Sequence, residues 1–245
     1  MDSQYVAGRN PVLEILKTDK EIDKLYILKG DLQGSINKII GIARDKNIVI
    51  QEVDKNKLDS MGGGSNHQGV VALVTSYKYA EADDILEKAK ARGQDPFVII
   101  LDGIEDPHNL GAIIRTAECA GVHGIIIPKR RSATVNQTVY KSSAGAVEHM
   151  LVAKVNNINN EIESLKEKGL WIFGADVEGS ALHFKTDLKG PIALVIGSEG
   201  KGLSRLTKEK CDVLVKIPMT GKISSLNASN AAAVLIYEVV RQNHG

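Results

Sequence analysis

Hydrophobic and polar residues alternate over the first 76 residues in a pattern that predicts helices and strands in turn. Three short apolar runs have the length of strands, at residues 24–28, 48–53 and 69–75. Apolar residues recur at helical spacing in two further places, at residues 12–16 and at Ile36, Ile39, Ile40 and Ala43. We therefore expect residues 1–76 to form a small α/β domain.

Two polar segments interrupt this pattern. Residues 60–69, SMGGGSNHQG, hold too much glycine for regular structure and predict a mobile loop. Residues 77–95 are rich in Lys and Glu and run into Pro96, which predicts a linker that contains some helix. The domain boundary is therefore expected within residues 77–95.

Beyond Pro96, continuous apolar runs alternate with amphipathic stretches. The runs lie at residues 97–101, 124–128, 170–175, 192–197 and 212–218. Because they are apolar on both faces, they predict the strands of a buried parallel sheet. Helices are expected between them, at residues 110–120, 157–168 and 228–242. Residues 96–245 therefore predict a second α/β domain.

Composition adds to this picture mainly by what it excludes. The chain has 245 residues, of which 43% are hydrophobic and 25% charged, enough for a sizeable core. No apolar stretch approaches the roughly 20 residues of a membrane helix, and the opening MDSQYVAGRN has no basic-then-apolar leader, so we expect a cytoplasmic protein. Cys119 and Cys211 lie outside any CxxC or Cys/His cluster, which argues against a disulfide framework and a zinc site.

Charge neither indicates nor excludes an RNA partner. The formal net charge of +1 lacks the overall basicity often seen in nucleic-acid-binding proteins. Phosphate contacts need only a local basic patch, and candidate residues are Lys129, Arg130, Arg131, Lys141, Lys201, Arg205, Lys208 and Lys210. The alternative for each of them is a solvated surface charge.

In open parallel sheets, ligands bind beyond the carboxyl ends of strands, and three such junctions here are rich in polar groups. The first, LDGIEDPHNLG at residues 101–111, leads into the helix that carries Arg115. Asn109 lies near the start of this helix, where it is either a cap or a site residue. Because the neighbours of Arg115 face the core, we expect this cation to need a partner or a polar cleft.

The second junction is VIGSEGKGL at residues 195–203, where three glycines within six residues let the backbone approach a ligand. Its spacing matches neither the dinucleotide fingerprint nor the P-loop. A ligand held by this loop therefore needs no pyrophosphate or phosphate cradle at a helix terminus. The third junction, residues 217–233, carries more hydroxyls and amides than one helix cap requires, at Ser224, Ser225, Asn227, Ser229 and Asn230.

Together the three junctions resemble the signature motifs of the SpoU/TrmH (SPOUT) family of RNA ribose 2′-O-methyltransferases. The matching segments are NLGAIIRTAECAG, LVIGSEGKGLS and IPMTGKISSLNASNAAAVLIYE. The segments VAGRNPVLEIL and HQGVVALV are similar to the ribosomal-protein-L30e-like substrate-binding domain of the longer members, especially bacterial 23S rRNA guanosine 2′-O-methyltransferases. The resemblance implies an L30e-like domain at residues 1–76, a linker at residues 77–95, and a parallel-sheet domain at residues 96–245 with a deep trefoil knot.

The resemblance also implies a site, a cofactor and partners. S-adenosylmethionine would be held mainly by backbone groups of the second and third junctions, at Gly197, Ile217 and Leu226, without a metal. Arg115 matches the family's catalytic arginine, and the other polar site positions are matched by Asn109, Glu199, Ser225 and Asn227. Since arginine stays protonated in proteins, we expect Arg115 to bind an RNA phosphate and stabilise the developing alkoxide rather than act as a base.

The partners implied are RNA, with 23S rRNA as the expected substrate, and a second copy of the chain. The final apolar helix, with Val234, Leu235, Ile236, Val239 and Val240, is expected either in a dimer interface or in the core. Arg9 and residues 62–64 are candidate RNA contacts, and the target nucleotide is expected in an accessible loop or bulge.

Three other functions stay open. One is a tRNA ribose methyltransferase, although common tRNA-modifying relatives extend beyond the position of Gly245 with a basic helix. Another is a resistance-type rRNA ribose methyltransferase with the same layout. The third is a catalytically silent RNA-binding or ribosome-assembly factor, against which the intact motif residues argue.

Overall fold

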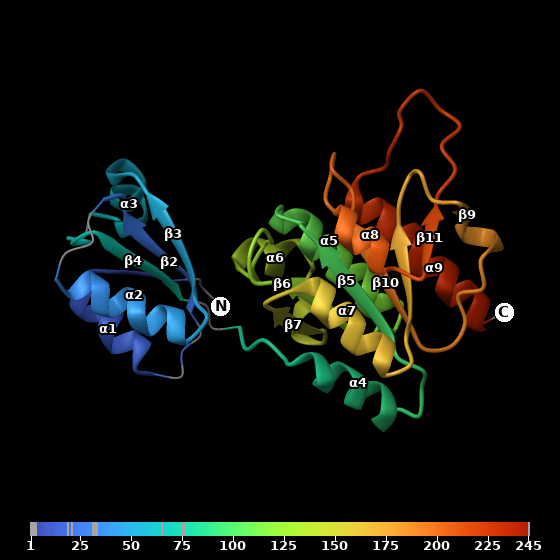
Figure 1. Ribbon diagram of the computed structural model, residues 1–245, viewed down its shortest axis with the longest axis horizontal. Coiled ribbons are helices and arrows are strands. Elements are labelled where there is room, and N and C mark those ends of the chain that lie inside the picture. Colours follow the sequence, from blue (N-terminus) through green and yellow to red (C-terminus); the bar gives the residue numbers. More distant parts are fainter. Residues whose placement is uncertain are drawn as a thin grey trace. The chain divides into compact units, whose positions relative to one another are not determined.

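The computed structural model describes residues 4–18, 20, 22–30, 34–64, 66–74 and 77–244. The chain divides into two compact units, one within residues 1–78 and the other formed by most of the residues from 79 onward (Figure 1). Each unit has its own sheet and its own hydrophobic core.

The first unit is a four-stranded sheet in the order β1-β4-β2-β3, in which β2 and β3 are parallel and the other pairs antiparallel. Its elements are β1 (Gln4–Ala7), α1 (Arg9–Leu16), β2 (Ile22–Leu28), α2 (Ser35–Asp45), β3 (Val49–Val53), α3 (Lys55–Gly62) and β4 (Val70–Val74). Helices α1 and α2 cover one face, and Leu58 of α3 packs with Tyr26 and Val71 on the other. The predicted alternation of helix and strand is confirmed, with β1 and α3 as additional elements.

The predicted loop over residues 60–69 is wrong in its first part. Helix α3 continues to Gly62 because Asp54 caps its start, accepting a hydrogen bond from the Lys57 amide at 2.9 Å, and because Leu58 is fully buried. Gly63 then ends the helix in the left-handed conformation, with φ of 56°. Ser65 and Thr75, which belong to the predicted loop and strand, lie outside the described residues.

The second unit has a seven-stranded sheet in the order β7-β6-β5-β10-β8-β11-β9. Its strands are β5 (Phe97–Asp102), β6 (Gly124–Pro128), β7 (Leu151–Val155), β8 (Trp171–Ala175), β9 (Ala181–Leu182), β10 (Ile192–Gly197) and β11 (Val213–Lys216). Every pair of these strands is parallel, which confirms the predicted parallel sheet. The five predicted strands are all present, whereas β7 and β9 are partly exposed and lack a continuous apolar run.

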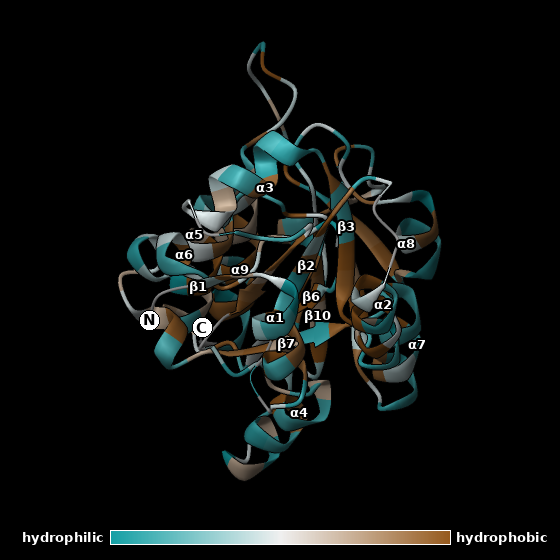
Figure 2. Cartoon of the chain, turned by 90° about the vertical axis from the view of Figure 1, so that its left-hand side faces the viewer, coloured by the Kyte–Doolittle hydropathy of each residue, from teal (hydrophilic) through white to brown (hydrophobic). Residues whose placement is uncertain are grey.

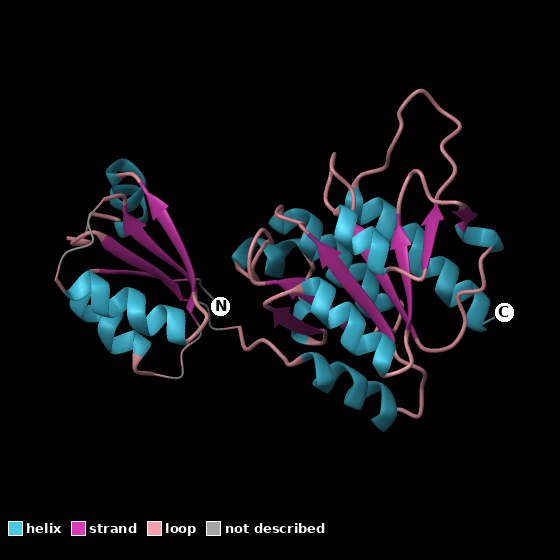
Figure 3. Ribbon diagram, viewed as in Figure 1, coloured by secondary structure: helices cyan, strands magenta, loops and turns pink. Residues whose placement is uncertain are grey.

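Helices lie on both faces of this sheet, as Figures 1 and 3 show. They are α4 (Ala82–Ala91), α5 (Pro107–Cys119), α6 (Gln137–Ser142), α7 (Ile158–Glu167), α8 (Arg205–Lys210) and α9 (Ala228–His244), with two short 3-10 helices at Ala146–Glu148 and His183–Lys185. On one face, α4 and α7 pack in a common core with β5 and β10. Helices α5 and α9 pack against each other, and α9 also contacts β10.

Figure 2 shows the hydrophobic colour concentrated in strands such as β6 and β10, with hydrophilic colour on the helices around them. This arrangement explains why the apolar runs predicted the strands more completely than the helices. Among the residues that the structure describes, no helix is both long and apolar enough to cross a membrane.

Helix α4 lies within the predicted linker but belongs to the second unit. A reciprocal capping box between Glu81 and Asp84 starts the helix, and Ile85 and Ala89 are fully buried. The side chain of Ile85 lies against β6 so closely that a Cβ on Gly124 would come within 2.5 Å of it. The helix expected within residues 77–95 is therefore present, but two core residues in a polar segment were too few to show that it packs against the sheet.

We expect Ile85→Ala to lower the free energy of unfolding of the second unit by about 3 kcal/mol, because it removes a fully buried side chain and leaves a cavity. Urea unfolding followed by the fluorescence of Trp171, the single tryptophan, in β8, measures this. Ile223→Ala makes the same chemical change at a residue that is 76% exposed and should change stability by less than about 0.5 kcal/mol. Equal effects of the two variants would contradict the packing of α4.

Candidate active site

The candidate site lies at the carboxyl edge of the parallel sheet in the second unit. Strands β5 and β10 are neighbours. On its other side β10 pairs with β8, and β11 follows β8 in the sheet. The segments that follow these three strands are the three junctions singled out in the sequence. Because parallel strands end at the same edge, the sheet brings the junctions together.

One side chain from each junction joins a hydrogen-bonded cluster formed by Asn109, Glu199 and Asn227. The Nδ2 of Asn109 donates to Oε1 of Glu199 at 2.8 Å. The Nδ2 of Asn227 donates to Oδ1 of Asn109 at 3.1 Å and also to Oε1 of Glu199. Asn109 is 6% exposed, whereas Glu199 and Asn227 are exposed. Two amides thus hold one oxygen of a carboxylate that faces solvent.

The amide of Asn109 is available for this cluster because another residue caps its helix. Asp106 accepts a hydrogen bond from the His108 amide at 2.9 Å, and Pro107 occupies the first turn of α5. The interpretation of Asn109 as a helix cap is therefore wrong. Its buried side chain instead connects the first junction to the other two.

Asn227 has both of the roles between which the sequence left a choice. Its Oδ1 accepts hydrogen bonds from the Ser229 amide at 2.9 Å and the Ser229 hydroxyl at 2.6 Å, at the start of α9. Its Nδ2 at the same time donates to the cluster. The position and orientation of this amide are therefore set by the helix start.

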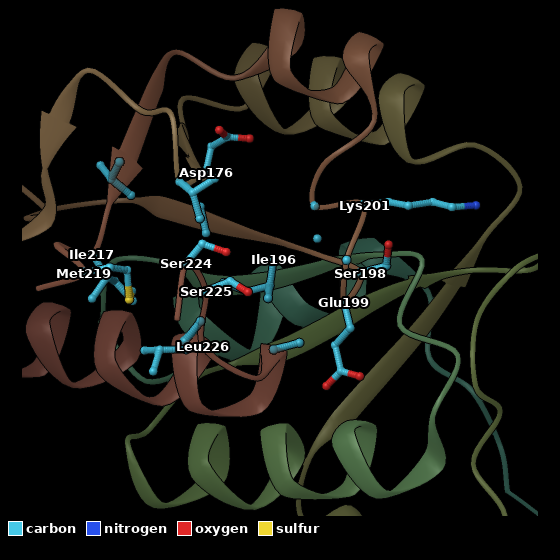
Figure 4. A pocket seen from close by; sticks show the side chains of 18 of the residues that line it. Asp176, Ile196, Ser198, Glu199, Lys201, Ile217, Met219, Ser224, Ser225 and Leu226 are labelled. Carbon is cyan, nitrogen blue, oxygen red and sulfur yellow. The ribbon is translucent and has the colours of Figure 1, made fainter. Parts of the chain in front are cut away.

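A cavity of about 270 Å³, called here the β10 cavity, opens beside this cluster. Its walls come from the ends of β8, β10 and β11 and from the segment before α9. Gly197, Ile217 and Leu226, the three expected cofactor residues, all line it, as do Glu199 and Ser225. Figure 4 shows Ile217, Met219 and Leu226 on one side of the cavity and Glu199 on the other.

The loop after β10 explains why residue 197 is a glycine. Ser198 and Gly202 exchange two backbone hydrogen bonds of 3.2 and 2.8 Å, which close a tight turn. A Cβ on Gly197 would lie 2.2 Å from the carbonyl carbon of Gly202. The glycine is therefore required by the turn itself, in addition to any approach of a ligand.

A second cavity of about 360 Å³, called here the α5 cavity, is also lined by Glu199. The segment between β5 and α5 forms one wall, including Gly103, Glu105 and Asn109. Because Glu199 lines both cavities, its carboxylate stands where two bound molecules could meet.

Arg115 and Ser225 are outside the hydrogen-bonded cluster. Arg115 is exposed on α5, and within the described parts of the chain it makes no hydrogen bond or ion pair. The partner or polar cleft expected for this cation is not found among the described residues, because Ile114 points into the core whereas Arg115, the next residue of the helix, is exposed. Ser225 lines the β10 cavity and is exposed.

One charged residue of the β10 cavity, Asp176, was missed in the sequence, and it pairs with Lys208, which was expected only as a candidate phosphate contact. Asp176 follows β8, its side chain is only 4% exposed, and its Oδ2 forms an ion pair of 2.6 Å with Nζ of Lys208. This hydrogen bond raises the pKa of Lys208 above its usual value. The rule that ligands bind beyond strand ends also applies to β8 and could have identified Asp176.

Over the ranges that the structure describes, no group of three or more His, Cys, Asp or Glu side chains is placed to hold a metal ion.

Comparison with known protein families gives two matches that cover most of the chain. Residues 96–237 match the SpoU rRNA Methylase family. Residues 5–80 match a family described as RNA 2′-O ribose methyltransferase substrate binding. The two matches correspond closely to the two units of the structure.

Similar proteins carry consistent names. A Bacillus subtilis (strain 168) protein named as a TrmH family tRNA/rRNA methyltransferase, YacO, is 49% identical over 240 residues, covering 98% of this chain and 96% of that protein. A Staphylococcus aureus (strain MSSA476) protein with the same family name is 45% identical and covers 100% and 98% of the two chains. Among solved structures, this chain is similar to the crystal structure of the SpoU methyltransferase AviRb from Streptomyces viridochromogenes in complex with the cofactor AdoMet. The two sequences are 27% identical, the TM-score is 0.61, and the match covers 98% of this chain and 90% of AviRb.

Proposed function

Because this chain belongs to the SpoU/TrmH family of RNA methyltransferases, which use S-adenosylmethionine, we propose that it methylates the ribose 2′-hydroxyl of a guanosine in 23S rRNA. The observation that carries the proposal is the cluster of Asn109, Glu199 and Asn227, in which Glu199 lines two cavities. The match of residues 5–80 to an RNA substrate-binding family supports an RNA ribose as the methyl acceptor.

The β10 cavity fits the cofactor in its chemistry. Apolar side chains of Ile217, Met219 and Leu226 suit the faces of an adenine ring, and the backbone around Gly197 is open on the cavity side. The carboxylate of Glu199 suits the positive charge of a sulfonium group. When bound, the cofactor supplies an activated methyl group for transfer to the hydroxyl oxygen.

The residues of the cluster act by positioning. Both amides donate to Oε1 of Glu199, so Oε2 is left to accept a hydrogen bond from a substrate group. Holding the hydroxyl and the methyl group about 3–3.5 Å apart in the right orientation accounts for a large part of such a rate enhancement. Ser225, on the wall of the β10 cavity, is placed to orient the same substrate or the loop that carries it.

We assign Arg115 the role of binding the RNA phosphate next to the target ribose and stabilising the developing alkoxide. A carboxylate that orients a guanidinium is a common positioning pair, and Glu199 is the candidate carboxylate. Arg115 has no such partner among the described residues of its own subunit, which favours an Arg115 that acts at the site of a second copy.

A homodimer is therefore part of the proposal. On α9, Leu235, Ile236 and Val239 are in the core, whereas Val234 is 38% and Tyr237 is 50% exposed. These exposed apolar side chains lie on the helix that packs against α5, which carries Arg115. Covering them with a second subunit would bury apolar surface and bring Arg115 to an interface.

Three finer features of the family also remain proposals for this chain. They are the deep trefoil knot around the second and third junctions, the L30e-like character of the first unit, and the cytoplasm as its location. Arg9 remains a candidate RNA contact. Its Nε donates to the carbonyl of Gln68 at 2.8 Å, and this contact holds it beside the end of the glycine-rich segment at residues 60–69.

Methyl transfer tests the reaction and the substrate together. We expect label from S-adenosylmethionine to enter unmodified 23S rRNA at one guanosine, in a linkage that resists alkali because its 2′-hydroxyl is blocked. Bulk tRNA is the parallel substrate. Label in tRNA alone, or at an rRNA nucleotide other than guanosine, would overturn the proposed substrate. Cofactor and RNA binding without any transfer would overturn the reaction in favour of an RNA-binding factor.

A further inference from the structure

The pair formed by Asp176 and Lys208 is built into the wall of the β10 cavity. Oδ1 of Asp176 accepts a hydrogen bond from the Glu178 amide at 2.8 Å, and Oδ2 pairs with Nζ of Lys208 at 2.6 Å. Two donors therefore fix the carboxylate in place. Since each carboxylate oxygen can accept about two hydrogen bonds, both retain capacity for a ligand.

This pair is costly as a purely structural feature. Asp176 is 4% exposed, so its charge is almost fully removed from water and depends on Lys208 for compensation. Apolar side chains that fill such a position are often as stabilising as a buried ion pair, or more so. A buried carboxylate beside a cavity therefore points to a ligand that uses it as an acceptor.

The position of Asp176 in the cavity narrows the choice of ligand group. Figure 4 shows Asp176 and Glu199 at opposite ends, with Ser225 and Ile196 between them. If methyl transfer takes place at Glu199, the groups that reach Asp176 are those remote from the methyl group. These are the ribose and adenine of the cofactor and its amino-acid end.

Among these groups, the ribose hydroxyls match Asp176 best. They are neutral donors, so a buried carboxylate can bind them without the cost of burying another charge. The cation of Lys208, 2.6 Å from the carboxylate, disfavours the ammonium of the amino-acid end. The faces of adenine suit the apolar side chains of Ile217 and Met219 elsewhere in the cavity.

We propose that Asp176, held by Lys208, binds the ribose hydroxyls of S-adenosylmethionine and so fixes the adenosine end of the cofactor. The inference rests on the proposed function in one respect, because it takes the β10 cavity as the cofactor site. It makes Asp176 a binding residue that the three signature junctions do not include.

Calorimetric binding of S-adenosylhomocysteine and 5′-methylthioadenosine tests the proposal. The second compound has the ribose and adenine but no amino-acid end. We expect Asp176→Asn to weaken both by about thirtyfold, since hydrogen bonds to a charged group contribute about 1.5–3 kcal/mol. Lys210→Gln removes a lysine of the same helix that pairs with Glu163 and does not line the β10 cavity, so it should weaken both less than about threefold. Thermal unfolding of both variants verifies the fold.

A dideoxy ligand identifies the group that is bound. Wild-type protein should bind the 2′,3′-dideoxy form of 5′-methylthioadenosine about thirtyfold more weakly than the parent compound, and Asp176→Asn should bind the two nearly equally. A loss with S-adenosylhomocysteine but not with 5′-methylthioadenosine would place Asp176 at the amino-acid end and overturn the proposal. Equal losses in Asp176→Asn and Lys210→Gln would also overturn it, because the effect would then not be specific to the carboxylate in the cavity.

Binding of the two parent compounds to the wild-type protein tests separately whether the β10 cavity is the cofactor site. If the protein bound neither parent compound, the β10 cavity would not be the cofactor site, and the proposed mechanism would fail together with this inference. If it bound both and Asp176→Asn bound them equally well, only the inference about Asp176 would fail.

Discussion

Replacing Glu199 with glutamine should lower kcat for methyl transfer by about a hundredfold or more and leave the affinity for RNA within about threefold. The glutamine oxygen can still accept from Asn109 and Asn227, so the cluster is preserved while its negative charge is lost. Removing one preorganised electrostatic group from an enzyme site typically costs about 10²–10³ in kcat. Single-turnover methyl transfer and RNA filter binding separate the two effects.

Glu167→Gln is the matched control for this variant. Glu167 ends α7, which leads into the start of β8, so it lies at the edge of the sheet opposite the site, and it is exposed. The same chemical change there should leave kcat unchanged. A Glu199→Gln variant with wild-type kcat would show that the carboxylate only connects the loops.

Asn227→Asp separates the chemical role of the cluster from the stability of α9. Aspartate caps helices as well as asparagine, so the hydrogen bonds to the Ser229 amide and hydroxyl should persist. The variant loses the amide donor to Glu199 and places a second carboxylate beside it. We expect little change in Tm and a loss of activity similar to that of Glu199→Gln.

The sequence predicted the sheet of the second unit well because its strands are apolar on both faces. β5 and β10 are buried along nearly their whole length, and both were located within one residue. β7 was missed because Lys154 interrupts its apolar run. The strand is also only partly buried at its ends. Helix α4 has only Ile85 and Ala89 in the core, and a polar segment with so few apolar positions is typical of a linker.

The candidate site was predictable to the extent that it follows strand ends. The junctions after β5, β10 and β11 supplied Asn109, Glu199 and Asn227, and the structure joins these three side chains. Asn109 could not be told from a cap because Asp106, three residues earlier, has an equal preference for that role. Asp176 was missed because one acidic residue after β8 resembles any surface turn.

The direction in which the Arg115 side chain points could be determined only from the structure. Its sequence neighbours Ile113, Ile114 and Ala117 are fully buried, and from this pattern a partner or a polar cleft was expected for the cation. In helix α5, Arg115 is instead exposed to solvent, although these neighbours are buried. The absence of a hydrogen bond or ion pair to Arg115 among the described residues of its own subunit agrees with the proposed dimer, in which Arg115 acts at the site of the partner.

Arg115→Ala should therefore lower methyl transfer by about a thousandfold, and Arg115→Lys should retain part of the activity. Lysine keeps the charge that binds phosphate and stabilises an alkoxide, but it lacks the bidentate geometry of arginine. RNA binding by both variants should weaken much less than transfer. Complete loss of transfer in Arg115→Lys with intact RNA binding would argue that the guanidinium itself takes part in proton transfer.

Mixing two inactive variants tests whether Arg115 acts at the site of the partner. Co-expressed Arg115→Ala and Glu199→Gln chains form mixed dimers in which one site combines an intact Glu199 from one chain with an intact Arg115 from the other. Random pairing in a twofold dimer should restore about a quarter of the wild-type activity. If both residues instead served the same subunit, every site in the mixture would carry one substitution, and no activity would return. Restoration would thus connect the exposed position of Arg115 on α5 to catalysis through the dimer.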